Sequence, residues 1–303
     1  MCGIVGLFAK DAALEAELGA HLATMLASLG DRGPDSAGFA IYAPPVADAV
    51  KLTLRGPPGY DFAALAHALR GRLPGPIAIH PRGTHAVLVV PDGDAAQARD
   101  LLGALAPELV MVGAGRSMEL YKEVGPPADV ARHFDLTHMQ GSHGIGHTRM
   151  ATESAVTTDG AHPYSTGPDQ CLVHNGSLSN HNAIRRELRR YGHRFATEND
   201  TEVAAAYLTA KLGTGLSLPT ALQGSLRDLD GFYTFVVGTE TGFAVLRDPI
   251  ACKPAVMAET ARFVAFGTEY RALADLPGIE QARVWEPEPA TVYQWDRQQE
   301  PRP

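Results

Sequence analysis

The sequence has few cysteines, no long apolar run and no concentration of basic residues. Its three cysteines, Cys2, Cys171 and Cys252, are too few and too scattered for a disulfide framework or a metal cluster, which favours a reducing compartment. No apolar run approaches the roughly 18 residues of a membrane span, and the N-terminus lacks a targeting signal. The formal net charge of −8 argues against nucleic acid as the main partner. We therefore expect a cytoplasmic protein that binds neither membranes nor nucleic acid.

Apolar residues, by contrast, make up 45% of the 303 residues, which is enough to bury a large core. The β-branched run at 3–9 predicts a strand, and the leucines between 14 and 29 recur at helical spacing. Further strands are predicted near 38–43, 143–151 and 170–176, and several more after 232, with helices grouped between them. This order favours antiparallel sheets covered by helices, an α+β fold.

Residues 44–135 differ from the rest of the chain because prolines punctuate short segments. The segments predict a strand, a helix, two strands about a turn, a helix and a strand. That βαββαβ order is typical of a ferredoxin-like module. We therefore expect one domain over residues 2–303, with an α/β module inserted at 44–135.

The opening MCGIVGLF places Cys2 directly before an apolar strand. If the initiator methionine is removed, Cys2 carries both a thiol and a free α-amino group, which is a nucleophile with its own base. A lone cysteine is more often a small buried hydrophobe, so other residues must decide between the two interpretations.

Two further motifs each allow a structural and a functional interpretation. Asn175-Gly176 is a strong signal for a tight hairpin turn, but an Asn side-chain amide and a Gly backbone N–H can also form an oxyanion hole. Asn199 followed by Glu202 predicts a helix-capping box with Asp200 in the first turn. Alternatively, Asp200 could hold the ammonium group of a ligand.

The segment GIGHTRMATE ends an alternating strand with Arg149. Arg149 is either a solvated strand end or a guanidinium fork for a substrate carboxylate. His143 and His147 lie on the same strand without a carboxylate or thiol at ligand spacing, so core or hydrogen-bonding roles are favoured over metal binding.

Five motifs in order resemble those of the class II glutamine amidotransferases, which are N-terminal-nucleophile hydrolases. They are Cys2-Gly3-Ile4, the segment 32–38 (RGPDSAG), Gly146-His147-Thr148-Arg149, His174-Asn175-Gly176 and Asp200-Thr201-Glu202. The resemblance covers residues 2–43 and about 141–270. It implies a four-layer αββα sandwich with the cysteine at the end of a central strand, and hydrolysis of L-glutamine to glutamate and ammonia through a Cys2 thioester.

The resemblance also implies roles for individual residues. The catalytic group would consist of the nucleophile Cys2 and the oxyanion donors Asn175 and Gly176. The substrate-binding group would consist of Arg149 for the α-carboxylate and Asp200 for the α-ammonium, with Thr152 and Arg32 beside them. Arg32 would order the loop over the nucleophile. Aminosugar-forming relatives have Trp-Ala-Thr-His after the arginine, where this chain has Met-Ala-Thr-Glu, so roles for Met150 and Glu153 are not carried over.

The segment HGIGHTRMATESAV looks most like the corresponding sequence in the separate amidotransferase subunit of N-methylglutamate synthase, a relative of glutamate synthase. This likeness implies a heteromeric complex in which synthase subunits receive the ammonia. FMN and an iron–sulfur cluster would then lie in a partner subunit, and no cofactor in this chain. Two alternatives stay open: an N-terminal-cysteine hydrolase of other amides, which the opposite charges of Arg149 and Asp200 disfavour, and an idle assembly subunit, which retention of Cys2 and Asn175 disfavours.

Overall fold

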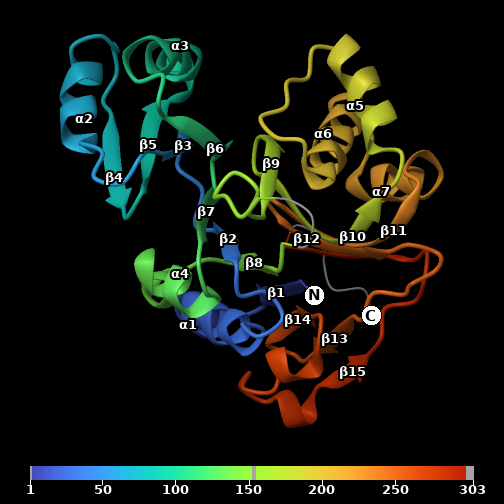
Figure 1. Cartoon of the computed structure of the whole chain (residues 1–303). Coiled ribbons are helices and arrows are strands. Elements are labelled where there is room, and N and C mark those ends of the chain that lie inside the picture. Colours follow the sequence, from blue (N-terminus) through green and yellow to red (C-terminus); the bar gives the residue numbers. More distant parts are fainter. Residues whose placement is uncertain (1, 152–154, 298–303) are drawn as a thin grey trace.

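The computed structural model describes residues 2–151 and 155–297 (Figure 1). Within these residues the largest sheet has seven antiparallel strands in the order β15-β13-β14-β1-β8-β2-β7. Its strands are β1 (Gly3–Ala9), β2 (Ser36–Tyr42), β7 (Met118–Val124), β8 (His143–Arg149), β13 (Val256–Glu259), β14 (Phe263–Gly267) and β15 (Arg283–Trp285). The first strand of the chain is therefore central, with β14 on one side and β8 on the other.

A second sheet of five strands lies face to face with the first, in the order β16-β12-β11-β10-β9. It consists of β9 (Tyr164–Gly167), β10 (Gln170–Leu178), β11 (Gly231–Thr239), β12 (Gly242–Arg247) and β16 (Val292–Asp296). An apolar core that includes Ile4, Ile145, Val173 and Phe266 joins the inner faces of the two sheets.

Helices cover the outer face of each sheet. On the seven-stranded sheet these are α1 (Ala12–Ser28) and α4 (Pro127–His133), and on the five-stranded sheet α5 (His181–Arg190), α6 (Asp200–Gly213) and α7 (Leu218–Asp228). The leucines of α1 face the sheet, and Asp11 begins the helix by accepting a hydrogen bond from the Leu14 N–H at 2.8 Å. The four-layer αββα arrangement expected from the resemblance is confirmed. No described helix is long and apolar enough to cross a membrane.

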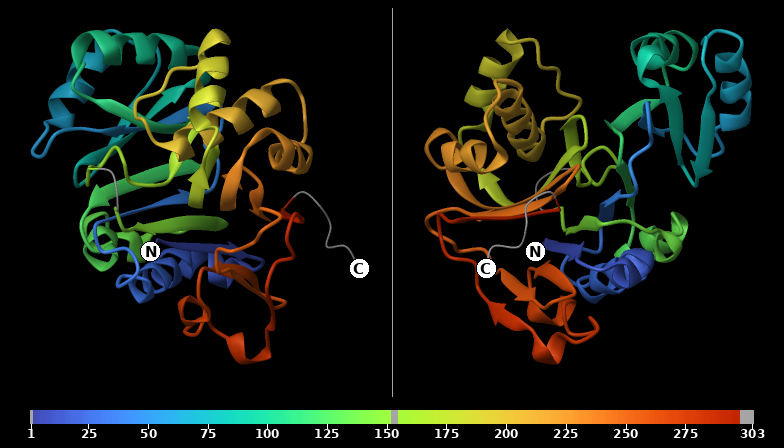
Figure 2. Two further views of the ribbon diagram at one scale, coloured as in Figure 1. Left: turned by 45° about the vertical axis from the view of Figure 1, so that its right-hand side comes forward. Right: turned by 180° about the vertical axis from the view of Figure 1, so that it is seen from behind.

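A third sheet forms a module with its own core. It is built in the order β3 (Ala49–Arg55), α2 (Phe62–Arg70), β4 (Ala78–Arg82), β5 (His85–Pro91), α3 (Ala95–Leu105) and β6 (Val110–Gly115). The strand order β4-β5-β3-β6 places the first and third strands in the centre, as a ferredoxin-like module requires. Figures 1 and 2 show this module and α5–α7 on the same side of the seven-stranded sheet, opposite α1.

The module is shorter than the proline-punctuated block of the sequence. Its sheet runs from residue 49 to residue 115, whereas β7 pairs with β2 in the large sheet and α4 packs on α1. Residues 118–133 therefore belong with the layers that support Cys2 rather than with the module.

Candidate active site

Cys2 stands directly before β1, where the central strand reaches one edge of the inter-sheet core. Its side chain is partly exposed, and Sγ lies 3.8 Å from the Met150 carbonyl oxygen. Cys171, in contrast, is fully buried, and burial raises the pKa of its thiol to about 12. Cys252 is exposed. Of the three, Cys2 is the thiol with both access and an organised polar surrounding.

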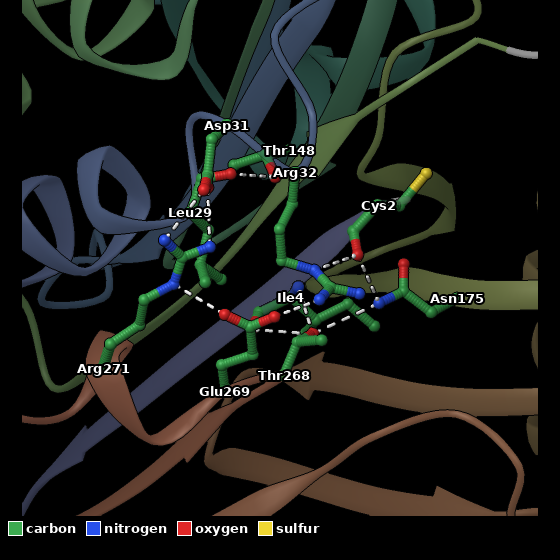
Figure 3. Close-up of polar contacts among 10 residues, drawn as sticks. All are labelled: Cys2, Ile4, Leu29, Asp31, Arg32, Thr148, Asn175, Thr268, Glu269 and Arg271. Carbon is green, nitrogen blue, oxygen red and sulfur yellow. Dashed lines mark hydrogen bonds and ion pairs between the residues drawn. The ribbon is translucent and has the colours of Figure 1, made fainter.

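Asn175 reaches Cys2 from the opposite sheet (Figure 3). Its Nδ2 donates to the Cys2 carbonyl oxygen at 3.3 Å and to Thr268 Oγ1 at 3.2 Å, while its Oδ1 lies 3.2 Å from His147 Nε2. Because Nδ2 faces two oxygen acceptors and Oδ1 faces a ring nitrogen, the orientation of the amide is fixed. The donor end of Asn175 is therefore directed at Cys2, the residue immediately before β1.

Asn175 and Gly176 do not form a hairpin turn. They lie inside β10, paired with Thr234 and Tyr233 of β11, so the turn interpretation of this dipeptide is wrong. Gly176 has φ 144°, and a Cβ there would lie 2.0 Å from the Phe232 carbonyl oxygen. Only glycine fits this backbone.

Arg32 approaches Cys2 from the loop after α1. Its Nε donates to the Cys2 carbonyl oxygen at 3.2 Å, and its Nη1 pairs with the Glu269 carboxylate. Arg32 and Asn175 thus both donate to the Cys2 carbonyl. In Figure 3 the Cys2 sulfur points away from these two donors.

Thr268 and Glu269 are site residues that the sequence interpretation missed. They directly follow the buried strand β14, and Thr268 Oγ1 accepts from the Ile4 N–H at 2.7 Å as well as from Asn175. A threonine and a glutamate at the end of an apolar strand were the available signal. Nothing local, however, connects them with Cys2, more than 260 residues away.

Arg149 ends β8 as predicted, but it is not a solvated strand end. Its exposed fraction is 7%, its backbone pairs with Ser36 of β2, and Nη1 donates to the Ala155 carbonyl oxygen at 3.5 Å. The register also places its neighbour Thr148 opposite Gly3, next to Cys2. The predicted substrate residue Thr152, like Glu153, lies outside the described residues.

Asp200 occupies the first position of α6, as predicted. Its Oδ2 accepts from the Leu178 N–H at 2.9 Å, and its Oδ1 lies 3.7 Å from His174 Nδ1. Both contacts are with β10, the strand that carries Asn175. Asp200 is therefore held at the same end of the five-stranded sheet as the predicted oxyanion donors.

The expected capping box is half formed. Asn199 Oδ1 caps α6 by accepting from the Thr201 N–H at 2.8 Å. Glu202, however, reaches back to the Ala196 and Thr197 N–H groups at 2.7 and 2.8 Å. Asn199 therefore caps the helix. The Asp200 carboxylate is not needed for capping and instead contacts β10.

Three buried histidines, His147, His162 and His174, lie beneath these residues. The rings of His147 and His162 are 4.1 Å apart, and Thr201 Oγ1 lies within hydrogen-bonding distance of His162 and His174. Burial lowers all three pKa values, that of His147 to about 3, so the rings are neutral at neutral pH. Because both partners of His147 Nε2 are acceptor oxygens, that nitrogen carries the proton and donates toward Asn175.

The histidines of β8 have hydrogen-bonding and packing roles. His143 stacks on Tyr42 at 4.1 Å between ring centroids, and its Nε2 lies 2.8 Å from the Thr239 carbonyl oxygen. Across residues 2–151 and 155–297, no group of three or more His, Cys, Asp or Glu side chains is arranged to hold a metal ion.

This chain is similar to known proteins in both sequence and fold. A family model described as a glutamine amidotransferase domain matches residues 147–275. The chain is 61% identical over 300 residues to the glutamine amidotransferase-like protein GlxB of Rhizobium meliloti strain 1021, a match that covers 98% of this chain and 99% of that protein. The chain belongs to the class II glutamine amidotransferases.

Two solved structures agree with this amidotransferase assignment at the level of fold. One is the allosteric regulatory enzyme of purine biosynthesis, with a TM-score of 0.63 and 20% identity over 97% of this chain. The other is the glutamine phosphoribosylpyrophosphate amidotransferase of B. subtilis, with a TM-score of 0.61 and 18% identity over 99% of this chain. The amidotransferase chain spans about half the length of each, 47% and 50%.

Proposed function

We propose that this amidotransferase hydrolyses L-glutamine at Cys2 and passes the ammonia to a synthase partner of the glutamate synthase type. The observation that carries the first half is the convergence of Asn175 on Cys2 from the opposite sheet, with the amide orientation fixed by Thr268 and His147. A donor held next to a partly exposed thiol is what acyl transfer requires.

The proposed reaction begins with removal of Met1, which frees the Cys2 α-amino group. Such an amine has a reference pKa of roughly 7.7–8.0 and can take the thiol proton near neutral pH. The thiolate turns from Met150 toward the substrate and attacks the amide carbon, and the negative charge develops on the amide oxygen. One Asn175 N–H leaves the Cys2 carbonyl to bond this oxyanion, together with the Gly176 N–H.

Collapse of the tetrahedral intermediate breaks the carbon–nitrogen bond. The Cys2 ammonium returns its proton to the leaving nitrogen, so ammonia departs and a thioester remains. Water, deprotonated by the same amine, then attacks the thioester carbon. Glutamate leaves, and the thiol regains its proton.

Arg149 and Asp200 fit the two ends of a free amino acid. Arg149 ends the strand next to β1 and can present its guanidinium to the α-carboxylate. Asp200 is bonded to Leu178, three residues beyond Asn175, and can accept the α-ammonium. Asp200→Asn should therefore raise KM for glutamine, with circular dichroism unchanged because Asn199, not Asp200, caps α6.

The second half of the proposal concerns the ammonia acceptor. The sequence around Arg149 resembles that of the amidotransferase subunit of N-methylglutamate synthase, and the match with GlxB spans 99% of that protein. We therefore propose separate synthase subunits as the ammonia acceptor, with FMN and an iron–sulfur cluster in the partner.

The test is to measure glutamate and ammonia released from glutamine by the chain alone, with its copurifying partner, and with partner and acceptor together. We expect slow hydrolysis alone and faster hydrolysis in the complex, because uncoupled hydrolysis wastes glutamine. Cys2→Ala should abolish activity in every condition. Equal rates in all three conditions would contradict the coupling, and no glutamate in any of them would contradict glutamine hydrolysis.

A further inference from the structure

Two loops from opposite ends of the chain meet beside Cys2. One follows α1 and carries Asp31 and Arg32, and the other follows β14 and carries Glu269 and Arg271. Figure 3 shows these four charged side chains in a continuous chain of ion pairs that ends at the Cys2 carbonyl. The glutaminase chemistry proposed above uses none of Asp31, Glu269 and Arg271.

Glu269 is the centre of this network. One carboxylate oxygen pairs with Arg32 Nη1, and the other lies 2.6 Å from Arg271 Nε. Arg271 in turn holds the Asp31 carboxylate with both terminal nitrogens, at 3.0 and 2.6 Å. Because Asp31 and Arg32 are adjacent in the chain, the four residues form a closed ring that fixes the Glu269 carboxylate from two sides.

The inner pair is the one close to the chemistry. The Arg32 side chain is 11% exposed and Glu269 33%, whereas Asp31 is 69% exposed. An arginine removed from water to this degree needs an anion beside it, since an unpaired buried charge is strongly unfavourable. The Glu269 carboxylate stabilises the guanidinium in this position, so its removal should weaken the bond from Arg32 to the Cys2 carbonyl oxygen.

Cys2 has an unusual need for such a fixed donor. Once Met1 is removed, no preceding residue anchors Cys2, so its orientation depends on β1 and on the hydrogen bonds to its own carbonyl. Asn175 and Arg32 supply those bonds. When Asn175 turns its N–H to the oxyanion, Arg32 is the donor that stays on the Cys2 carbonyl.

We propose that Glu269 is a positioning residue for glutamine hydrolysis: it holds Arg32 on the Cys2 carbonyl oxygen, and Arg271 and Asp31 align its carboxylate. This inference rests on the proposed role of Cys2 as nucleophile. It also gives Arg32 a defined contact on Cys2, where the family resemblance implies only that Arg32 belongs to the substrate site and orders the loop over the nucleophile. Loss of Glu269 should therefore affect turnover and leave glutamine affinity alone.

The first test compares Glu269→Gln with Glu259→Gln. Glu259 is a matched control, because its side chain is 31% exposed and pairs at 2.7 Å with Lys10, which directly follows β1. We expect Glu269→Gln to lower kcat roughly 10- to 100-fold with KM within about twofold of wild type. Glu259→Gln should match wild type in both constants. A raised KM with unchanged kcat would overturn the positioning role.

A double-mutant cycle with Arg32→Ala tests whether Glu269 acts through Arg32. If Glu269 acts through Arg32, adding Glu269→Gln to Arg32→Ala should lower kcat no further, whereas independent effects would multiply. Glu269→Asp, which keeps the carboxylate, should recover part of the kcat lost in Glu269→Gln. Multiplicative losses, or no difference between the Asp and Gln variants, would overturn the proposal.

A second readout does not need glutamine. Iodoacetamide labelling of Cys2 can be followed by peptide mass spectrometry, with the exposed Cys252 of the same molecule as the internal standard. Arg32 bonds the Cys2 carbonyl, so its release should change the orientation of Cys2 and shift the Cys2 labelling rate relative to Cys252 roughly threefold or more. An unchanged ratio in folded Glu269→Gln, checked by thermal melting, would overturn the proposal. If the wild type and its complex never hydrolyse glutamine, the proposed function fails, and this labelling ratio still decides the role of Glu269.

Discussion

Replacing Asn175 by alanine should separate catalysis from stability. The side chain is 5% exposed and its truncation removes three hydrogen bonds, a number that by itself would predict a large loss of stability. Each partner, however, keeps a second bond: the Cys2 carbonyl with Arg32, Thr268 Oγ1 with the Ile4 N–H, and His147 Nε2 with the His174 carbonyl. No partner is left unsatisfied, so we expect a cost of only about 1–2 kcal/mol in the free energy of unfolding.

The catalytic cost should be larger. Loss of one oxyanion donor lowers kcat by roughly 10²–10³, or about 2.7–4 kcal/mol of transition-state stabilisation. The assay is glutamine turnover by the complex beside urea unfolding of the chain. Asn180→Ala is the control, because the Asn180 side chain likewise makes hydrogen bonds at both ends, with the Asp228 carbonyl at 2.9 Å and the Asp230 N–H at 3.0 Å, but stands directly before α5 instead of facing Cys2. Asn175→Ala with kcat within about threefold of wild type would refute the oxyanion role.

Three further predictions test the nucleophile, the substrate site and the buried histidines. A diazoketone analogue of glutamine should label Cys2 and not Cys252, and intact-mass analysis should show loss of Met1; an active preparation that retains Met1 would contradict the mechanism. Arg149→Lys keeps the charge but loses the fork, so KM for glutamine should rise with circular dichroism unchanged. Burial lowers the pKa of His143 from 6.5 to about 3. Between these two values the imidazole is protonated in the unfolded state and neutral in the folded state. Stability should therefore fall by about 2 kcal/mol between pH 7 and 5 for this residue, and urea midpoints of His143→Gln should fall less over that range.

The sequence predicted those elements whose signal is local. β1 and α1 followed from a β-branched run and from leucines at helical spacing, and the βαββαβ order of the module followed from segment lengths and turn residues. The strand β7 was missed because MELYKEV mixes charges with apolar residues. Its Lys122 is nevertheless 5% exposed and donates to the Ala161 carbonyl oxygen at 2.8 Å. A lysine that pairs with a carbonyl of a distant loop cannot be recognised from its own neighbourhood.

The candidate site likewise contains residues with a local sequence signal and residues without one. Cys2, Asn175 and Asp200 stand in short motifs that carry their chemistry, so the sequence alone identifies them as candidates. Thr268 and Glu269 do not, because their relevance arises only when β14 pairs with β1 and brings them to Cys2. The sequence also allowed Arg149 to be an exposed strand end. Only its burial in the folded structure excludes that interpretation.

The polar site is an extension of the inter-sheet core, and this links packing to catalysis. Side chains two residues apart on a strand share a face. Four residues of the site accordingly stand two positions from a core residue of the same cluster: Cys2 from Ile4, His147 from Ile145, Asn175 from Val173, and Thr268 from Phe266. Because protein cores are close-packed and transmit small displacements, a cavity at one of these four core positions should shift its polar partner along the same strand. The contacts on Cys2 and Asn175, at 3.2–3.3 Å, would lengthen before the sheets separate, so truncating this core should lower turnover at temperatures where the fold is still intact.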